Sequence, residues 1–198
     1  MILIILENTF KTMAVTLSVE LLGSKRKIWR SFVVKNDIML SDLHDILQII
    51  LGWRDAHLHE FIVHKLHFGD VAFNEETDPK LYSIDERTAP LSQIIHSVKT
   101  SFLYNYDNDW HHKIRIVSIL PLEKNLFYPS CISGQNACPP EDLVGIEEYD
   151  KLIADLAKKG RKYEERREWL VQGGYKNFDP KSFNIDAVNK VLSKRFKS

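Results

Sequence analysis

Within positions 14–22, apolar and polar residues alternate without a break from Val15 to Leu21. A period of two places successive side chains on opposite faces of an extended chain, so this segment must bury one face and expose the other. The apolar members are Val15, Leu17, Val19 and Leu21, and the polar members are Thr16, Ser18 and Glu20. Residues 14–22 are therefore predicted to form a half-buried strand.

Two hairpins follow from this pattern and its repetition later in the chain. A basic turn at 23–27 leads into an apolar, β-branched stretch at 28–34, which predicts a hairpin over 14–34. A second hairpin is predicted over 101–120, where aromatic residues alternate before an Asp-Asn-Asp turn at 107–109 and Ile114 and Ile116 share one face after it. Antiparallel pairing is expected in both, because short turns connect the strands.

Residues 41–51 carry a helical pattern instead. Ser41 is predicted to be the N-cap, and Gly52 is predicted to end the helix in a left-handed conformation. Between them, apolar residues recur at the spacing of one helix face: Leu43, Ile46, Leu47, Ile50 and Leu51.

The rest of the chain completes an α+β fold. We expect a strand over 57–68, an exposed acidic loop over 70–88, a short helix within 90–95, a loop over 121–145, and helices over 146–156, 163–171 and 185–196. Strands come mostly first and helices mostly last. This order predicts a mainly antiparallel sheet built from hairpins, with helices packed on one side. Residues 1–13 are read as an N-terminal extension, with Met13 an alternative start, and 14–198 as a single domain.

Composition argues against membrane-spanning, secreted and disulfide-rich proteins. The chain has 198 residues, of which 44% are apolar and 27% charged, as in ordinary globular proteins. Its apolar start, Met1 to Leu6, is far shorter than the roughly 20 residues of a membrane span, and no signal-peptide pattern is visible. The two cysteines are too few for a disulfide scaffold. A reducing, cytoplasmic location is therefore expected.

Charge is unevenly distributed although the formal net charge is zero. Residues 151–198 carry 13 Lys and Arg against 6 Asp and Glu, whereas residues 1–150 carry 14 against 21. A basic segment can bind nucleic acid or an acidic partner. We expect it to dock on the acidic body or to be solvated, as most charged segments are.

Common catalytic signatures are absent from the sequence. It contains no GxGxxG, GxxxxGK[ST], HExxH or GxSxG pattern, which argues against a common nucleotide-dependent enzyme or serine hydrolase.

The first candidate site is His57-Leu58-His59. On a strand, His57 and His59 would point to the same face, and two imidazoles so placed can share one metal ion. The alternative is that both histidines form hydrogen bonds at the rim of the sheet.

Other candidates flank the second hairpin and the following loop. His112 shares the parity of inward-facing residues, which is typical of a hydrogen-bonded core histidine, while Asp107 and Asp109 can shape the turn, orient a histidine or bind a cation. Cys131 and Cys138 would complete a zinc set with His57 and His59, although both could simply be buried thiols. Asp142 can favour a helix N-terminus or join the site.

These segments, in this order, resemble the plasmid ORF-three-like family, named after an open reading frame of a root-inducing plasmid and also described as an insertion-element passenger protein. The resemblance covers roughly residues 14–195. It implies an α+β fold and a mobile-element context, and it carries no established activity. It rests on Ile28-Trp29-Arg30, Leu43-His44, Gly52-Trp53, His57-Leu58-His59-Glu60-Phe61, Tyr104 to His112, Tyr128-Pro129-Ser130-Cys131, Cys138-Pro139-Pro140-Glu141-Asp142, Phe178-Asp179-Pro180 and Val188-Asn189.

Two classes of function stay open. The first is a non-enzymatic binding or accessory module, and the second is a metal-dependent enzyme with a His/Cys/Asp site and a divalent metal such as Zn. We hypothesise that the histidines lie near loop 128–142, which its prolines stiffen. The candidate pocket then comprises Trp53, His57, His59, Asp107, Asp109, Trp110, His112 and Asp142.

The first prediction concerns nucleic acid. We expect weak binding without sequence preference, because the basic segment 151–198 is offset by an acidic remainder and no DNA-reading motif is visible. Fluorescence anisotropy with several duplexes at increasing salt measures this. A tight complex with one sequence that survives moderate salt would contradict it.

Overall fold

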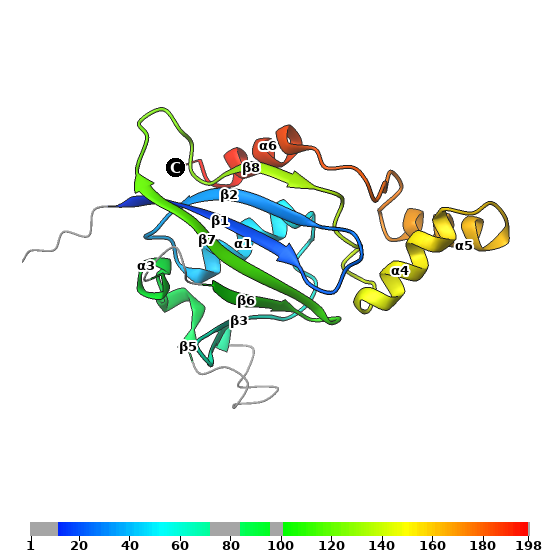
Figure 1. Cartoon of the computed structure of the whole chain (residues 1–198), viewed down its shortest axis with the longest axis horizontal. Coiled ribbons are helices and arrows are strands. Elements are labelled where there is room, and N and C mark those ends of the chain that lie inside the picture. Colours follow the sequence, from blue (N-terminus) through cyan, green and yellow to red (C-terminus); the bar gives the residue numbers. More distant parts are fainter. Residues whose placement is uncertain (1–11, 72–83, 96–100, 198) are drawn as a thin grey trace, which may run out of the picture.

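The computed structural model describes residues 12–71, 84–95 and 101–197. Their strands form one sheet in the order β5-β4-β3-β6-β7-β1-β2-β8, shown in Figure 1. The described strands are β1 (Met13–Leu21), β2 (Trp29–Lys35), β3 (His59–Val63), β4 (Leu66–Gly69), β5 (Ile84–Asp85), β6 (Ser101–Tyr106), β7 (Trp110–Pro121) and β8 (Ser130–Gln135). Neighbouring strands are antiparallel except for β4 and β5.

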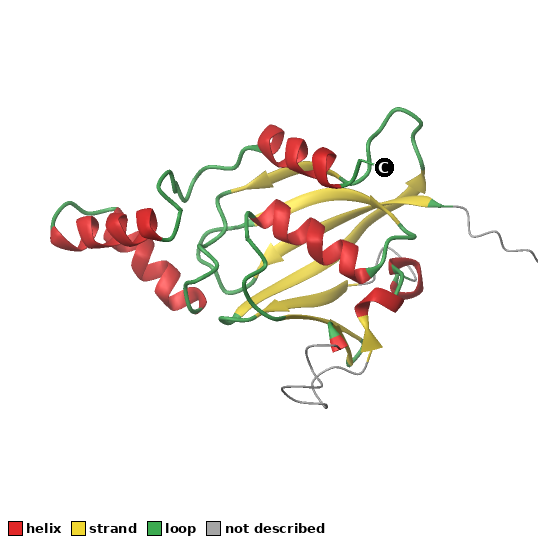
Figure 2. Ribbon diagram, turned by 180° about the vertical axis from the view of Figure 1, so that it is seen from behind, coloured by secondary structure: helices red, strands yellow, loops and turns green. Residues whose placement is uncertain are grey.

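Helices cover one face of this sheet. The described helices are α1 (Leu40–Leu51), the 3-10 turn η1 (Glu86–Thr88), α3 (Leu91–Ile94), α4 (Gly145–Leu156), α5 (Arg161–Gln172) and α6 (Ile185–Arg195). Figure 2 shows α1 and α6 lying across the same side of the strands. In Figure 1, α4 and α5 extend beyond one end of the sheet. The predicted α+β class, with a mainly antiparallel sheet and helices on one side, is confirmed.

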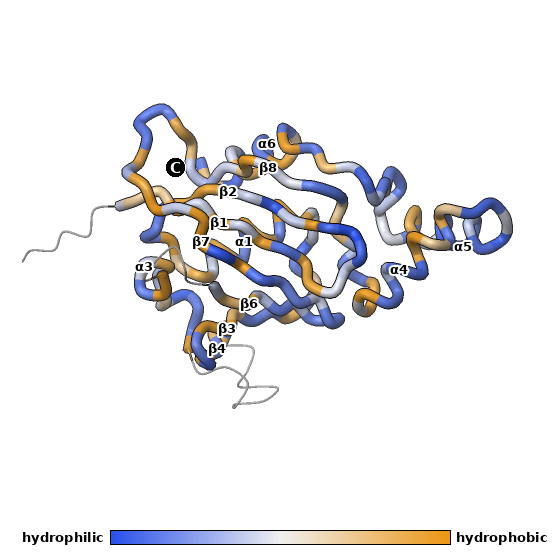
Figure 3. The backbone as a smooth tube through the Cα atoms, viewed as in Figure 1, coloured by the Kyte–Doolittle hydropathy of each residue, from blue (hydrophilic) through white to orange (hydrophobic). Residues whose placement is uncertain are grey.

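The period-two pattern explains why one face is covered. Val15, Leu17 and Val19 of β1 are at most 1% exposed and face the helices, whereas Thr16, Ser18 and Glu20 are only partly buried. Figure 3 shows the same mixture of hydrophobic and hydrophilic residues along the central strands. Both predicted hairpins are present, as the antiparallel pairs β1–β2 and β6–β7.

Helix α1 packs its apolar stripe on the sheet and ends as predicted. Gly52 has φ 82° and donates its N–H to the Gln48 carbonyl at 2.9 Å. The prediction of Ser41 as N-cap is wrong. The cap is Met39, whose backbone N–H donates to the Asp42 carboxylate at 3.1 Å. Asp42 thus satisfies the N–H of the cap residue, and the first helical N–H, that of Leu40, donates to the Ala89 carbonyl at 3.0 Å instead of to a Ser41 hydroxyl.

Two other predicted boundaries also differ from the structure. The strand expected over 57–68 begins only at His59 and is interrupted by a turn at His64 and Lys65, both with positive φ. The loop expected over 121–145 contains the edge strand β8, which was not predicted because its residues are mostly small and polar. Of the acidic loop expected over 70–88, residues 72–83 lie outside the described residues.

The basic C-terminal part contacts the acidic body at defined points. Arg195 of α6 lies 2.7 Å from Asp45 of α1, and Arg166 of α5 lies 3.5 Å from Glu148 of α4. Within the described ranges, no helix is both long and apolar enough to cross a membrane.

Asn189 of α6 joins that helix to β8 by a pair of hydrogen bonds. Its Oδ1 accepts the Cys131 backbone N–H at 2.7 Å, and its Nδ2 donates to the Cys131 carbonyl at 2.9 Å. One side chain therefore satisfies both backbone groups of a strand residue, which fixes α6 against the sheet.

The second prediction tests this contact. Asn189→Ala should lower the free energy of unfolding by about 1–3 kcal/mol, because two backbone groups lose their partner. Urea unfolding followed by circular dichroism measures the change. The neighbouring exposed Lys190→Ala is the control and should stay within about 0.5 kcal/mol of wild type. Equal stability of all three proteins would show that the contact contributes nothing.

Candidate functional site

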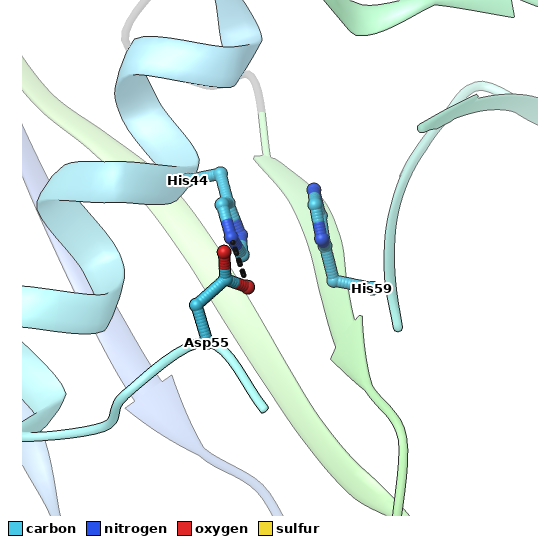
Figure 4. Close-up of side chains that lie close together, drawn as sticks. All are labelled: His44, Asp55 and His59. Atoms are coloured by element: carbon cyan, nitrogen blue, oxygen red, sulfur yellow. Dashed lines mark hydrogen bonds and ion pairs between the residues drawn. The ribbon is translucent and has the colours of Figure 1, made fainter. Parts of the chain in front are cut away.

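Two histidines from different elements stack at one end of the covered face. His44 of α1 and His59 at the start of β3 have ring centroids 3.5 Å apart and planes tilted by only 10°. Figure 4 shows the rings entering from opposite directions, with Asp55 beside His44. We call His44 and His59 the histidine pair.

His44 is held by a defined hydrogen-bond network. The Asp55 backbone N–H donates to Gln48 Oε1 at 3.0 Å, which orients the Gln48 amide so that Nε2 donates to the Tyr104 hydroxyl at 3.0 Å. The hydroxyl can then donate to His44 Nδ1, 2.9 Å away. His44 Nε2 in turn donates to Asp55 Oδ1 at 2.8 Å. The Asp55 backbone N–H therefore sets, one after another, the orientations of the Gln48 amide, the Tyr104 hydroxyl and the His44 ring.

The same network sets the charge states of its ends. The hydrogen bond from His44 lowers the pKa of Asp55, so this carboxylate stays ionised and ready to accept. Complete burial holds the pKa of Tyr104 well above its usual range, so the hydroxyl keeps its proton.

His59 has its own carboxylate. Its Nε2 lies 2.7 Å from Glu86 Oε2 at the start of η1, and both side chains are nearly buried. Each member of the histidine pair thus contacts one acidic group.

Ligand atoms of three residues converge at this point. One atom each of His44, Asp55 and His59 lie within 4.8 Å of one another, a grouping that suits a metal ion. Asp55 occupies the left-handed region, with φ 59°. A non-glycine residue in that region is often part of a functional site, and aspartate tolerates it better than most residues.

Two cavities adjoin the histidine pair. The first, which we call the Asp55 cavity, has a volume of about 320 Å³ and is lined by Asp55, Ala56, His57, Leu58, His59, Asp70 and Asp107. The second, the His111 cavity, has about 370 Å³ and is lined by Leu58, His59, Glu60, Asn105, Tyr106, Asp107, Asp109 and His111. Each is large enough for a small molecule.

His57 lies apart from the stack, although it lines the Asp55 cavity together with His59. It precedes β3, and its Nε2 is 3.0 Å from Asn108 Nδ2 and 3.5 Å from Asp142 Oδ1. The structure therefore places His57 against the loop that holds Asp142, while His59 faces Glu86 and His44.

An aromatic layer braces that loop. Trp53 stacks on Tyr106, with centroids 4.9 Å apart, and its indole N–H donates to the Pro139 carbonyl at 2.8 Å. The Trp110 indole donates to the carbonyl of buried Glu141 at 3.3 Å. Glu141 also accepts the Arg54 backbone N–H through its carboxylate at 2.7 Å. Trp53 and Trp110 thus support the site, and hydrogen bonds satisfy their buried indole N–H groups.

Asp107 and Asp109 occupy the turn between β6 and β7, where both shape the backbone or a neighbour. Asp107 accepts the Asn108 backbone N–H at 2.9 Å, and Asp109 accepts from His111 Nε2 at 2.7 Å. Both line the His111 cavity, and Asp107 also lines the Asp55 cavity.

The cysteines lie elsewhere in the fold. Cys131 contacts the Ser31 carbonyl at 3.6 Å, and Cys138 accepts from buried Arg30 Nη2 at 3.4 Å. Both are free thiols whose pKa is raised by burial, which keeps them protonated. Neither belongs to the convergent group of His44, Asp55 and His59, so that group differs from the set with two thiols that the sequence predicts.

His112 is wholly buried among aromatic rings. Its Nδ1 donates to the Tyr104 carbonyl at 3.2 Å, whereas its Nε2 has no hydrogen-bond partner among the described residues. A second ring proton would therefore be buried without an acceptor. Burial accordingly lowers the pKa of His112 to about 4, and the ring stays neutral.

Sequence reasoning missed His44, Asp55 and Glu86 as site residues. A signal existed for the first, because His44 and Gln48 are polar residues four apart on the apolar face of a predicted helix. Asp55 and Glu86 had no such signal, since both come from irregular segments.

Three comparisons place the chain among known proteins. The model of the plasmid pRiA4b ORF-3-like protein family matches residues 13–187. An uncharacterized protein of Sinorhizobium fredii, y4hQ, is 31% identical over 170 residues, which cover 83% of each chain. The crystal structure of a protein of unknown function, MM3350 of Methanosarcina mazei, is similar with a TM-score of 0.75 and 29% identity, covering 89% of this chain and 97% of that one.

The third prediction concerns His112 and acid stability. The unfolded chain takes up a proton near pH 6.5, whereas the folded state resists it until about pH 4, so stability falls as pH drops between these values. The loss from this ring is about 3 kcal/mol at pH 4. His112→Leu cannot titrate. Urea unfolding of both proteins at pH 7 and pH 4 should show the variant losing less, and parallel pH profiles would refute the assignment.

Proposed function

Since the chain belongs to the plasmid pRiA4b ORF-3-like protein family, whose two relatives described above have no stated activity, we propose a function from its site. The protein is a binding module that holds a divalent ion of the zinc class through His44, Asp55 and His59. The ion in turn binds a small ligand in the Asp55 cavity. The observation that carries this proposal is the convergence of three ligand atoms from three separate segments.

The donor set fits a borderline transition-metal ion. Two imidazoles and one carboxylate suit zinc, iron or nickel better than calcium or magnesium, which prefer oxygen. Donor atoms around tetrahedral zinc lie about 3.3 Å apart, given bonds of about 2.0 Å. Because no two of these atoms are more than 4.8 Å apart, each pair needs to close by at most about 1.5 Å. A metal ion lies in the plane of each imidazole that binds it, so the two rings, whose planes now differ by only 10°, would have to rotate well away from their stacked arrangement.

Outer contacts support the same assignment. Metal-bound histidines usually have their second ring nitrogen fixed by a carboxylate or another polar group. Glu86 takes that place for His59, and the Tyr104 hydroxyl does so for His44. If Nε2 of His44 held an ion, the ring would carry its proton on Nδ1, and the Tyr104 oxygen, which already accepts from Gln48 Nε2, would accept from Nδ1 as well, so the hydroxyl would lose His44 as the acceptor of its own proton.

A second candidate is a metal-dependent enzyme that uses the same ion. Three protein ligands leave a coordination position for water, which zinc can activate. The observation in its favour is that His57, 3.5 Å from Asp142, lines the same cavity. His57 could then move a proton to or from a substrate bound there. Turnover of a substrate would distinguish this candidate from simple binding.

We also propose three attributes that rest on the sequence and the family. The mobile-element association rests on the family name, the cytoplasmic location on the two thiols, and the weak nucleic-acid binding on the charge distribution.

The fourth prediction is one zinc ion per chain. Protein without a histidine tag, titrated with zinc against a chromophoric chelator, should bind one equivalent. His59→Ala and Asp55→Ala should each lower the affinity by about 100-fold or more, since even outer contacts contribute 10- to 100-fold. His67→Ala is the matched control. His67 lies on β4 beside Glu60, away from the convergent group, and its loss should leave zinc affinity unchanged.

X-ray absorption at the zinc edge separates the possible ligand sets. Nitrogen and oxygen ligands at about 2.0 Å support His44, Asp55 and His59, whereas sulfur at about 2.3 Å would point to the cysteines instead. Absence of stoichiometric binding, or equal affinity in all variants, would overturn the proposal.

A further inference from the structure

Asp107 stands where the two cavities meet. Leu58, His59 and Asp107 line both the Asp55 cavity and the His111 cavity. Strand register explains this position, because His59 pairs with Tyr106 and the Asp107 backbone N–H donates to the Leu58 carbonyl at 2.8 Å. The start of β3 and the end of β6 therefore bring Asp107 next to the histidine pair.

Asp107 differs from the other acidic residues of these cavities. Each of the others lies beside a basic group: Asp55 beside His44, Glu60 beside His67, Asp70 beside Arg87, and Asp109 beside His111. Among the described residues, Asp107 has no ion-pair partner, and its carboxylate accepts only the Asn108 backbone N–H of its own turn. It is exposed, so a ligand can reach it.

The histidine beside it also has a free polar atom. The His59 side chain is only 10% exposed, and its Nε2 is occupied by Glu86. No described group hydrogen-bonds its other ring nitrogen, Nδ1. Among the described residues, the fully buried side-chain atom without a partner is His112 Nε2, so Nδ1 of His59 remains accessible and the proposed ion can bind it.

We infer that the ligand is a small amino-acid-like molecule, which carries an oxygen anion for the ion and an ammonium group for Asp107. This inference rests on the proposed metal site and adds the chemical class of what binds there. The ion accounts for the anionic end, because its open position attracts oxygen anions. The unpaired carboxylate accounts for the cationic end and would repel a second anion.

The size of the cavities agrees with such a ligand. Volumes of about 320 and 370 Å³ are at the small end of the range for ligand pockets and suit a molecule of this kind.

Two hydroxamates that differ in one group test the inference. Propionohydroxamic acid and its 3-amino derivative share a zinc-binding end, and only the second carries an ammonium group. Calorimetric titration of the zinc-loaded full chain should show the amino derivative binding about fivefold more tightly, as expected for an exposed ion pair. In Asp107→Asn this preference should vanish while zinc affinity stays unchanged.

Asp109→Asn is the matched control. Asp109 occupies the same turn and the same cavity but is already paired with His111, so its variant should keep the fivefold preference. Equal affinity of both hydroxamates for wild type would overturn the inference and leave the zinc site standing. Failure of both to bind the zinc-loaded chain would also overturn it, since no coordination position would then be open. A chain that binds no zinc would remove the metal site and the inference together.

Discussion

A buried polar group must find a hydrogen-bond partner, and this requirement organises one end of the sheet. Helix α1 presents His44 and Gln48, 4% and 5% exposed, on the face that packs against the strands. Gln48 meets the requirement by joining the Asp55 backbone to the Tyr104 hydroxyl. The Gln48 amide thereby connects α1 to the segment that follows it and to β6 at the centre of the sheet. The hydrogen bond from the Asp55 backbone N–H to Gln48 stabilises the left-handed conformation of Asp55 and the position of its carboxylate.

The sequence predicted what one-dimensional periodicity can express. The alternation over β1 and the 3.6-residue stripe of α1 both arise because one face of each element is buried. These patterns are the same whichever elements that face packs against. The edge strand β8 was not predicted, because it has an exposed Ile132 and small polar residues where a regular strand would alternate. The turn at His64 and Lys65 was missed because neither residue is a usual turn former.

The candidate site was predicted only in part for a related reason. His57 and His59 were identified from their spacing, but spacing assumes one continuous strand, and the strand begins after His57. Their actual neighbours, Asn108 and His44, lie 51 and 15 residues away in sequence. Contacts of that kind are set by the sheet order, which places β3 beside β6 rather than beside β1. No local pattern encodes such an order.

The amide of Asn189 has a consequence beyond stability. Strand β8 is the last strand in its direction, and an open sheet edge is a template on which another chain can add a strand. By occupying both backbone groups of Cys131, Asn189 imitates one residue of a neighbouring strand. The C-terminal helix thus protects the chain against edge-to-edge association with copies of itself. Loss of residues 185–195 would remove this cover and leave the outward backbone groups of Cys131 free to pair with another chain.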